Sequence, residues 1–344
     1  MNARALLPLL FCITPSLAMV QGFAGLGQTS EGYAPPDPAT RFTFPDDHGS
    51  HPEFRIEWWY VTANLQDAEG TDYGIQWTLF RNALSPSGMP EDQAWMGHAA
   101  VSTPAGHLFA ERLARGGIGQ AGVKAAPFEA FIDEWRLAGP DLATVSVTAQ
   151  SHEFRYDLNL SSNGPFVPQG EHGFSVKSHA GQASHYYSQP FYSVTGTLHL
   201  QEGDVHVTGQ AWLDREWYSQ LLPPSQTGWD WFSLHLSDGE KLMGYRLRDR
   251  AEGEYVFGTW IAADGSPEPL RVGSLEMTPV EWAEVAGRQL PVAWDIANEA
   301  RGIAIRIAAI YPQSWMGTGI SYWEGPVQAS GSHSGEGYLE LTGY

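Results

Sequence analysis

The stretch HPEFRIEWWYVTANL, residues 51–65, decides the fold, because apolar and polar side chains alternate along it. Successive side chains of an extended strand point to opposite faces. Trp58 and Tyr60 therefore share one face, and Glu57 and Trp59 share the other. A carboxylate is costly to bury among aromatic rings unless it is paired. Glu57 is thus either part of an ion pair or a carboxyl kept in an aromatic pocket for proton chemistry.

The same alternation continues through most of the chain. Further short runs rich in β-branched and aromatic residues lie at 73–84, 94–103, 143–150, 154–160, 193–201, 204–213, 229–237, 240–249, 254–263, 302–310 and 321–331. Turn-forming sequences such as DAEGTD and SDGE separate them. Two stretches, 104–114 and 278–286, have weak helical periodicity. We predict an all-β chain built from antiparallel hairpins.

The chain of 344 residues is long enough for two domains. We predict an export and cleavage region at residues 1–24, a Gly- and Pro-rich linker at 25–40, and two β-domains at 41–204 and 205–344. The boundary is placed at the turn that follows the long strand-like run ending near residue 201.

The first residues, MNARALLPLLFCITPSLAMVQGFA, have the pattern of a signal peptide. Arg4 precedes a short apolar run, and small residues that suit cleavage follow it. The run contains proline and is too short to span a membrane. We expect a periplasmic or secreted protein without a transmembrane segment in its mature chain. The one cysteine, Cys12, lies in this leader, so we expect no disulfide or thiolate site.

The net charge of -20 makes nucleic acid an unexpected partner. No phosphate loop, dinucleotide fingerprint or zinc motif is present in the sequence, so we expect no cofactor and no metal. The loop DDHGSH, residues 46–51, has ligand-type side chains but fits a solvated turn better. GSHSGEG, residues 331–337, has the wrong spacing for a serine-hydrolase elbow.

A second aromatic strand contains another carboxyl, in AWLDREWYS at residues 211–219. Trp212, Asp214 and Tyr218 share a face. Asp214 could be a buried acid, whose pKa apolar walls would raise. The alternative is an ion pair, for which the candidate partners are Arg215, Arg246 and Arg248.

For Glu57 the structural alternative is favoured, because Arg55 shares its face and Arg246 could reach it from the second domain. We nevertheless count it among the candidate ligand-binding residues, which are otherwise aromatic or imidazole side chains on the strand-like runs. The set is Glu57, Trp59, Tyr218, Trp229, Trp231, His235 and Tyr245. A face that mixes aromatic with ionisable groups suits a barrel interior or a cleft.

Seven segments together resemble the AttH-like proteins, which are similar in turn to the carotenoid 1,2-hydratases (hydroxyneurosporene synthases). They are HPEFRIEWWYVTANL, GIQWTLF, GHAAVS, ASHYYSQPF, GQAWLDREWYS, GWDWFSLHLSDGEKLMGYRLR and YWEGPVQASG. The resemblance runs from about Phe42 to the C-terminus. It implies two lipocalin-like (calycin) antiparallel β-barrels packed together, with a ligand space in or between them. Some related fungal proteins are pericyclic cyclases, and many bacterial members are labelled predicted secreted hydrolases or lie beside ABC-transporter genes.

The resemblance to the hydratases also implies site residues. A histidine with an aromatic residue two positions later corresponds to His185 and Tyr187, and an aromatic residue two positions before an aspartate corresponds to Trp212 and Asp214. The sequence DREW departs from the hydratase pattern after the aspartate, so Arg215 could neutralise Asp214.

We therefore predict a protein that binds an apolar isoprenoid- or acyl-type molecule. The enzymatic hypothesis is acid-assisted hydration or rearrangement of a C=C bond, with Asp214 as donor and His185 assisting. The alternatives are a non-enzymatic periplasmic lipophile carrier that works with an ABC transporter, and a secreted hydrolase.

Overall fold

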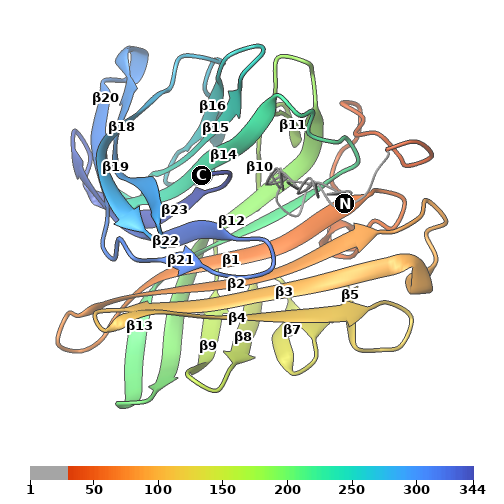
Figure 1. The fold of residues 1–344 in the computed structure, drawn as a ribbon, viewed down its shortest axis with the longest axis horizontal. Helices are drawn as coiled ribbons and strands as arrows, with labels where there is room; N and C mark the ends of the chain where they lie inside the picture. The colour runs from red at the N-terminus through yellow and green to blue at the C-terminus, as the bar shows by residue number, and fades with distance from the viewer. Residues whose placement is uncertain (1–29) are drawn as a thin grey trace, which may run out of the picture.

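A computed structural model describes residues 30–344, and the expected signal peptide and the start of the linker lie outside this range. The described chain forms two antiparallel sheets and three short 3-10 helices, without an α-helix among its described residues. Figure 1 shows the two sheets packed one above the other, the second sheet in colours that run from teal to blue. No helix in residues 30–344 is long and apolar enough to cross a membrane.

The first sheet has 13 strands, eleven of which follow one path in the order β4-β3-β2-β1-β13-β12-β9-β8-β7-β6-β5. β10 and β11 pair with β12 beside this path. The bounds are β1 (Ile56–Gln66), β2 (Asp72–Ala83), β3 (Gln93–Thr103), β4 (Gly106–Arg115), β5 (Ala121–Lys124), β6 (Phe128–Ile132), β7 (Trp135–Asp141), β8 (Thr144–Gln150), β9 (Arg155–Ser161), β10 (Val167–Pro168), β11 (Phe174–Val176), β12 (Ala183–Leu200) and β13 (Gly203–Tyr218).

The second sheet has 10 strands, nine of which follow the order β17-β16-β15-β14-β23-β22-β20-β19-β18, and β21 pairs with β22 beside them. The bounds are β14 (Gln226–Leu236), β15 (Lys241–Asp249), β16 (Tyr255–Ile261), β17 (Pro267–Pro269), β18 (Glu276–Val285), β19 (Arg288–Asn298), β20 (Ile303–Ala309), β21 (Trp315–Met316), β22 (Tyr322–Gly331) and β23 (Gly335–Leu341). The 3-10 helices are η2 (Asp46–His48), η3 (Pro90–Asp92) and η4 (Glu299–Arg301).

The all-β, lipocalin-like prediction is confirmed. The two weakly helical stretches are strands, because 104–114 overlaps β4 and 278–286 overlaps β18. The expected boundary between residues 204 and 205 is also corrected. It falls in the hairpin between β12 and β13, which both belong to the first sheet, and the chain passes to the second sheet only between Tyr218 and Gln226. A hairpin turn and an interdomain connection have the same turn-forming composition.

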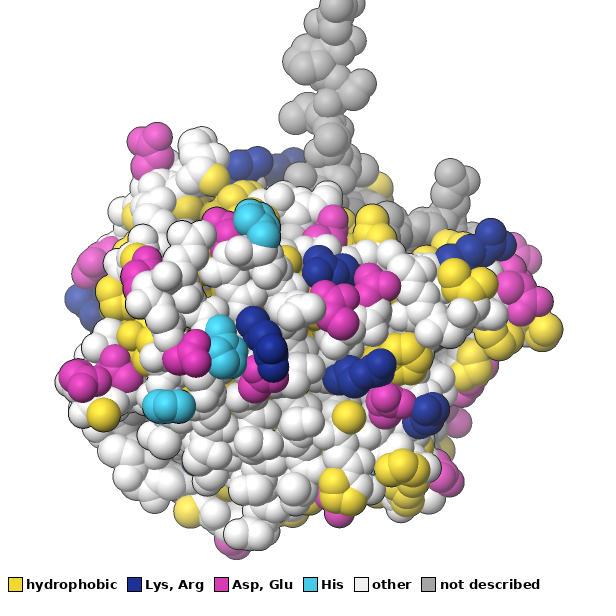
Figure 2. All heavy atoms as spheres, turned by 90° about the horizontal axis from the view of Figure 1, so that it is seen from below, with side chains coloured by type: hydrophobic (Ala, Val, Ile, Leu, Met, Phe, Trp, Pro, Cys, Tyr) yellow, Lys and Arg dark blue, Asp and Glu magenta, His cyan; other side chains and the backbone are white. Residues whose placement is uncertain are grey.

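Each sheet encloses a buried apolar core on its concave side. Trp59, Trp77 and Trp135 belong to the core of the first sheet, and Phe232 and Trp294 to that of the second. A third cluster of aromatic residues lies between the sheets. Charged side chains of both signs are interspersed on the surface seen in Figure 2. The aromatic cluster between the sheets is the candidate location of a binding site.

Candidate functional site

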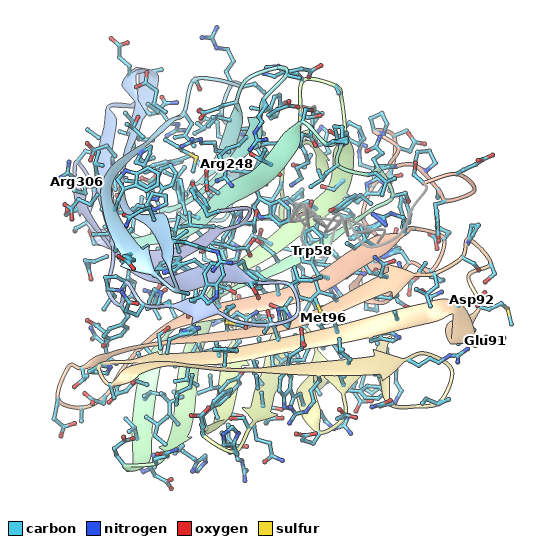
Figure 3. The ribbon with its side chains drawn as sticks, in the orientation of Figure 1. Trp58, Glu91, Asp92, Met96, Arg248 and Arg306 are labelled. Carbon is cyan, nitrogen blue, oxygen red and sulfur yellow. The ribbon has the colours of Figure 1, made fainter. Side chains whose placement is uncertain are left out.

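A cavity lies between the two sheets and is partly open to solvent, with an empty volume of about 1140 Å³ that includes open solvent. Strands β1, β2, β3, β12 and β13 supply one wall, and β14, β15, β22 and β23 supply the other. Figure 3 shows Trp58 and Met96, two of the lining residues, at the level where the sheets meet. The aromatic residues that line the cavity are Trp58, Tyr60, Phe80, Tyr186, Tyr218, Trp229, Trp231, Tyr245 and Tyr322.

Asp214 lies on β13 and contributes to the lining of this cavity. Trp212 Nε1 donates a hydrogen bond of 2.6 Å to Asp214 Oδ1. Ser188 Oγ donates to the same oxygen over 2.5 Å, and the Tyr186 hydroxyl donates to Oδ2 over 2.6 Å. No arginine or lysine in the described part of the chain forms an ion pair with Asp214. The ion-pair alternative for this residue is therefore wrong.

The protons of the two hydroxyl donors are directed at Asp214, because each hydroxyl oxygen already accepts another hydrogen bond. Gln169 Nε2 donates to Ser188 Oγ over 2.9 Å, and Trp231 Nε1 donates to the Tyr186 hydroxyl over 3.3 Å. Burial raises the pKa of Asp214 to about 7, although the three donors favour its ionised form. This carboxyl can therefore hold or release a proton near neutral pH.

Glu340 on β23 is a second, half-buried carboxyl of the cavity, which sequence reasoning missed. Trp229 Nε1 donates to Glu340 Oε1 over 2.6 Å. Burial, together with the charges of Asp214 and Glu216, raises the pKa of Glu340 to about 7, although the Trp229 hydrogen bond favours the ionised form. No sequence motif surrounds Glu340, so only the structure shows that it lines the same cavity as Asp214.

A third carboxyl of the cavity, Glu216, has a cationic partner. Lys177 Nζ lies 3.0 Å from Glu216 Oε1 and 4.4 Å from the ring centroid of Tyr186. Burial lowers the pKa of Lys177, and the charge of Glu216 opposes that shift. Sequence reasoning missed Lys177 as well, because it lies in the loop after β11, outside the strand patterns.

The structure separates the four residues that the hydratase resemblance assigns. His185 and Tyr187 pair in register with Trp217 and Arg215, so they lie on the sheet face opposite to Asp214. The backbone N–H of Asp37 donates to His185 Nε2 over 3.3 Å. Burial lowers the pKa of His185 to about 4.

The Tyr187 hydroxyl lies 2.7 Å from His48 Nδ1, and its ring is fully buried. The structure thus brings Trp212 and Asp214 together and places His185 and Tyr187 away from them. The expected assistance of His185 to Asp214 has no geometric support.

Glu57 and Trp59 also lie away from the cavity. Glu57 is fully buried and forms ion pairs with Arg81 and Arg215. Burial alone would raise the pKa of Glu57, but these two charges hold it well below its usual range. The Arg215 guanidinium carbon lies 3.9 Å from the ring centroid of Trp59. Placing Glu57 and Trp59 among the ligand-binding residues is therefore corrected, and the structural alternative for Glu57 is confirmed.

The arginines expected to neutralise these carboxyls have other partners. Arg246 and Arg248 both form ion pairs with Asp230 in the second sheet. Arg55 Nε donates to the carbonyl oxygen of Ser219. Sequence reasoning placed an arginine beside Glu57 correctly but named the wrong arginines, because the partners depend on strand register.

Of the remaining predicted ligand-binding residues, four line the cavity: Tyr218, Trp229, Trp231 and Tyr245. His235 is buried with its Nδ1 3.2 Å from Gln210 Oε1, and it does not line the cavity. In the loop DDHGSH, His51 Nε2 lies 3.1 Å from Asp47 Oδ1. Outside the cavity, Asp238, Glu240 and His333 bring three potential metal ligands together.

Comparisons with known proteins place this arrangement in a family. A family model described as AttH-like matches residues 35–344. A crystal structure described as an AttH from Nitrosomonas europaea is 33% identical, with a TM-score of 0.81, and the match covers 90% of this chain and 99% of that one. No curated protein matches the sequence significantly.

Two further solved structures share the fold at lower identity. Kievitone hydratase from Nectria haematococca is 14% identical with a TM-score of 0.69, and the match covers 91% of this chain and 96% of that one. CghA, solved with Sch210972, is 13% identical with a TM-score of 0.53, with 92% and 97% covered.

Proposed function

The chain belongs to the AttH-like family, and from this premise we propose that it is a hydratase-like protein that binds an apolar isoprenoid- or acyl-type molecule between its two barrels. The reaction is acid-assisted addition of water to, or rearrangement of, a C=C bond. The observation that supports it most is Asp214, a buried carboxyl without a cationic partner that lines an aromatic cavity.

Protonation of an alkene demands a strong donor and a shielded cation. Asp214 supplies the proton, because burial keeps part of its population protonated near pH 7. The faces of Trp229 and Trp231, which line the same cavity, would stabilise the tertiary cation by roughly 1–2 kcal/mol each when desolvated. The fold is shared with a hydratase, which is consistent with this chemistry.

A carrier needs the same cavity but no proton donor. In that second candidate function the protein holds a lipophile in the periplasm, in association with an ABC transporter. The apolar lining supports binding in both functions. The leader at residues 1–24 supports export in both. A carrier has no need of a buried carboxyl that can release a proton near neutral pH, which is why we favour the enzyme.

The test is to express the full chain with its leader, purify the exported protein, and identify the co-purifying lipophile by mass spectrometry. The wild type is compared with Asp214→Asn, which keeps the size of the side chain but cannot donate a carboxyl proton. We expect two species that differ by one water, with the precursor held by the variant. The same molecule in both proteins would support the carrier and contradict the enzyme.

A further inference from the structure

The cavity holds two carboxyls that lack a cationic partner, and only one of them is used above. We infer that Glu340 is a second catalytic residue, and that Glu340 and Asp214 share one proton so that one carboxyl donates while the other accepts. This inference rests on the proposed function. It names the group that takes the proton from the attacking water, a task for which no other residue has been assigned.

Trp231 is the strand neighbour of Glu340, and its hydrogen bonds lead towards Asp214. Glu340 on β23 lies directly opposite Trp231 on β14 in the strand register. Trp231 Nε1 donates to the Tyr186 hydroxyl, which in turn donates to Asp214 Oδ2. Glu340 and Asp214 thus lie on the two walls of the cavity, with Trp231 and Tyr186 between them.

Glu340 is held by one oxygen and keeps the other for a ligand. Trp229 Nε1 donates to Oε1. No described side chain or backbone N–H donates to Oε2, so this oxygen can accept a hydrogen bond from a molecule in the cavity. A carboxylate oxygen within reach of a bound water is the geometry that a general base requires.

The charges bear on how many protons the pair holds. Lys177 forms an ion pair with Glu216, and its charge also acts on Asp214 without an ion pair between the two; no described arginine or lysine forms an ion pair with Asp214 or Glu340. Burial penalises the ionised form of each, and the charge of Asp214 also raises the pKa of Glu340. Two carboxyls of one cavity that repel each other titrate as a coupled pair, so we expect the pair to share one proton near neutral pH.

In the forward reaction the Asp214 proton is transferred to one alkene carbon, and the π electrons form the new C–H bond. The other carbon becomes a cation. A water oxygen attacks it, the C–O bond forms, and Glu340 accepts the proton that this oxygen loses. The sum is alkene plus water to alcohol, and the pair returns to its initial state when the proton passes from Glu340 back to Asp214 through cavity water.

The other candidate bases fit less well. Glu216 is neutralised by Lys177. Glu324 does not line the cavity, and burial raises its pKa well above the usual range. His185 lies on the opposite face of the sheet. Glu340 is the carboxyl of this set that both faces the cavity and can be ionised at neutral pH.

The first experiment is a carboxyl ¹³C NMR titration of protein labelled at glutamate Cδ, without added ligand. Glu340→Gln assigns the signal, and Trp229→Phe, which removes its donor, gives a second assignment if the first variant does not fold. We expect the pKa of Glu340 to lie near 7 in the wild type and to fall by about one unit in Asp214→Asn, because the repelling charge is gone. An unchanged pKa in Asp214→Asn would overturn the shared proton.

The second experiment is the lipophile comparison by mass spectrometry, extended to Glu340→Gln and to Glu336→Gln. Glu336 lies on the same strand but outside the cavity, and its pKa is also raised by burial. We expect Glu340→Gln to hold the precursor and Glu336→Gln to hold the product. Loss of conversion in Asp214→Asn but not in Glu340→Gln would overturn the role of Glu340 and leave the proposed function intact. Absence of conversion in the wild type would overturn the proposed function itself.

Discussion

Glu57 and Asp214 lie on the neighbouring strands β1 and β13 of one sheet, on its opposite faces. Both are buried, but the groups that surround the two carboxyls differ in charge. Glu57 is ionised between Arg81 and Arg215. Asp214 has only neutral donors around it and titrates near pH 7. The comparison shows that the function of an acidic residue among tryptophans cannot be concluded from its aromatic neighbours in the sequence. Its function depends on whether the sheet face also provides a cation.

The largest expected effect is that of Glu57→Gln. The substitution leaves Arg81 and Arg215 buried without their counter-charge, which costs about 3–5 kcal/mol of unfolding free energy. Chemical denaturation at pH 7 measures it. The exposed Glu276→Gln is the control, with an expected change within about 0.5 kcal/mol. A loss below about 1 kcal/mol in Glu57→Gln would show that the two faces do not differ as described.

The next effect is the pH dependence of Asp214→Asn. The folded-state pKa of Asp214 is raised to about 7, so its favourable contribution is complete below its unfolded pKa and is lost as pH rises to about 7. The stability of the wild type should therefore fall relative to Asp214→Asn by about 2–3 kcal/mol between pH 5 and pH 8. Parallel denaturation series at both pH values measure this difference. A stability difference between the two proteins that does not change with pH would mean that Asp214 is ionised over the whole range.

A smaller effect is expected for Trp212→Phe, which removes one of the three donors to Asp214. The pKa of Asp214 should rise further, and the ionised form should lose about 1–2 kcal/mol. Trp77→Phe is the matched control, because the Trp77 N–H has no acceptor among the described residues. Both variants lose the same ring volume. Only Trp212→Phe should displace the pH dependence of unfolding to higher pH. An equal displacement in both variants would show that the Trp212 hydrogen bond does not stabilise the ionised form of Asp214.

The smallest expected effect is that of His185→Gln on lipophile conversion. His185 lies on the Glu57 face and binds the backbone of the segment before β1, so conversion should stay near the wild-type level. Mass spectrometry of the co-purifying lipophile tests this expectation. A tenfold loss of conversion in a folded variant would restore the partnership between His185 and Asp214.

Alternation in the sequence is enough to predict the strands, but it fails at the edges of the sheets. β4 and β18 are end strands of their sheets, and the sequences of both have weak helical periodicity. Most residues of β4 are half-buried on both faces, and Trp282 on β18 is 52% exposed. An edge strand packs on fewer neighbours, so the alternation between buried and exposed side chains is weaker.

The site could be predicted only within single strands. Because side chains alternate, Trp212 and Asp214 share a face, and so do His185 and Tyr187. Whether the two pairs meet depends on the register between β12 and β13, in which Ser188 and not Tyr187 lies opposite Asp214. Register and long-range packing also bring Glu340 into the cavity, from 126 positions further along the chain. No local pattern could have indicated that contact.

The central claim is that one sheet has an ionised, structural carboxyl on one face and a protonatable, functional one on the other. Its most direct test is a ¹³C carboxyl titration of protein labelled at both aspartate and glutamate, with Asp214→Asn and Glu57→Gln as assignments. The account predicts that the Asp214 signal titrates near pH 7 while the Glu57 signal stays ionised down to at least about pH 4. An Asp214 signal already ionised at about pH 5, as for an ordinary aspartate, would contradict it.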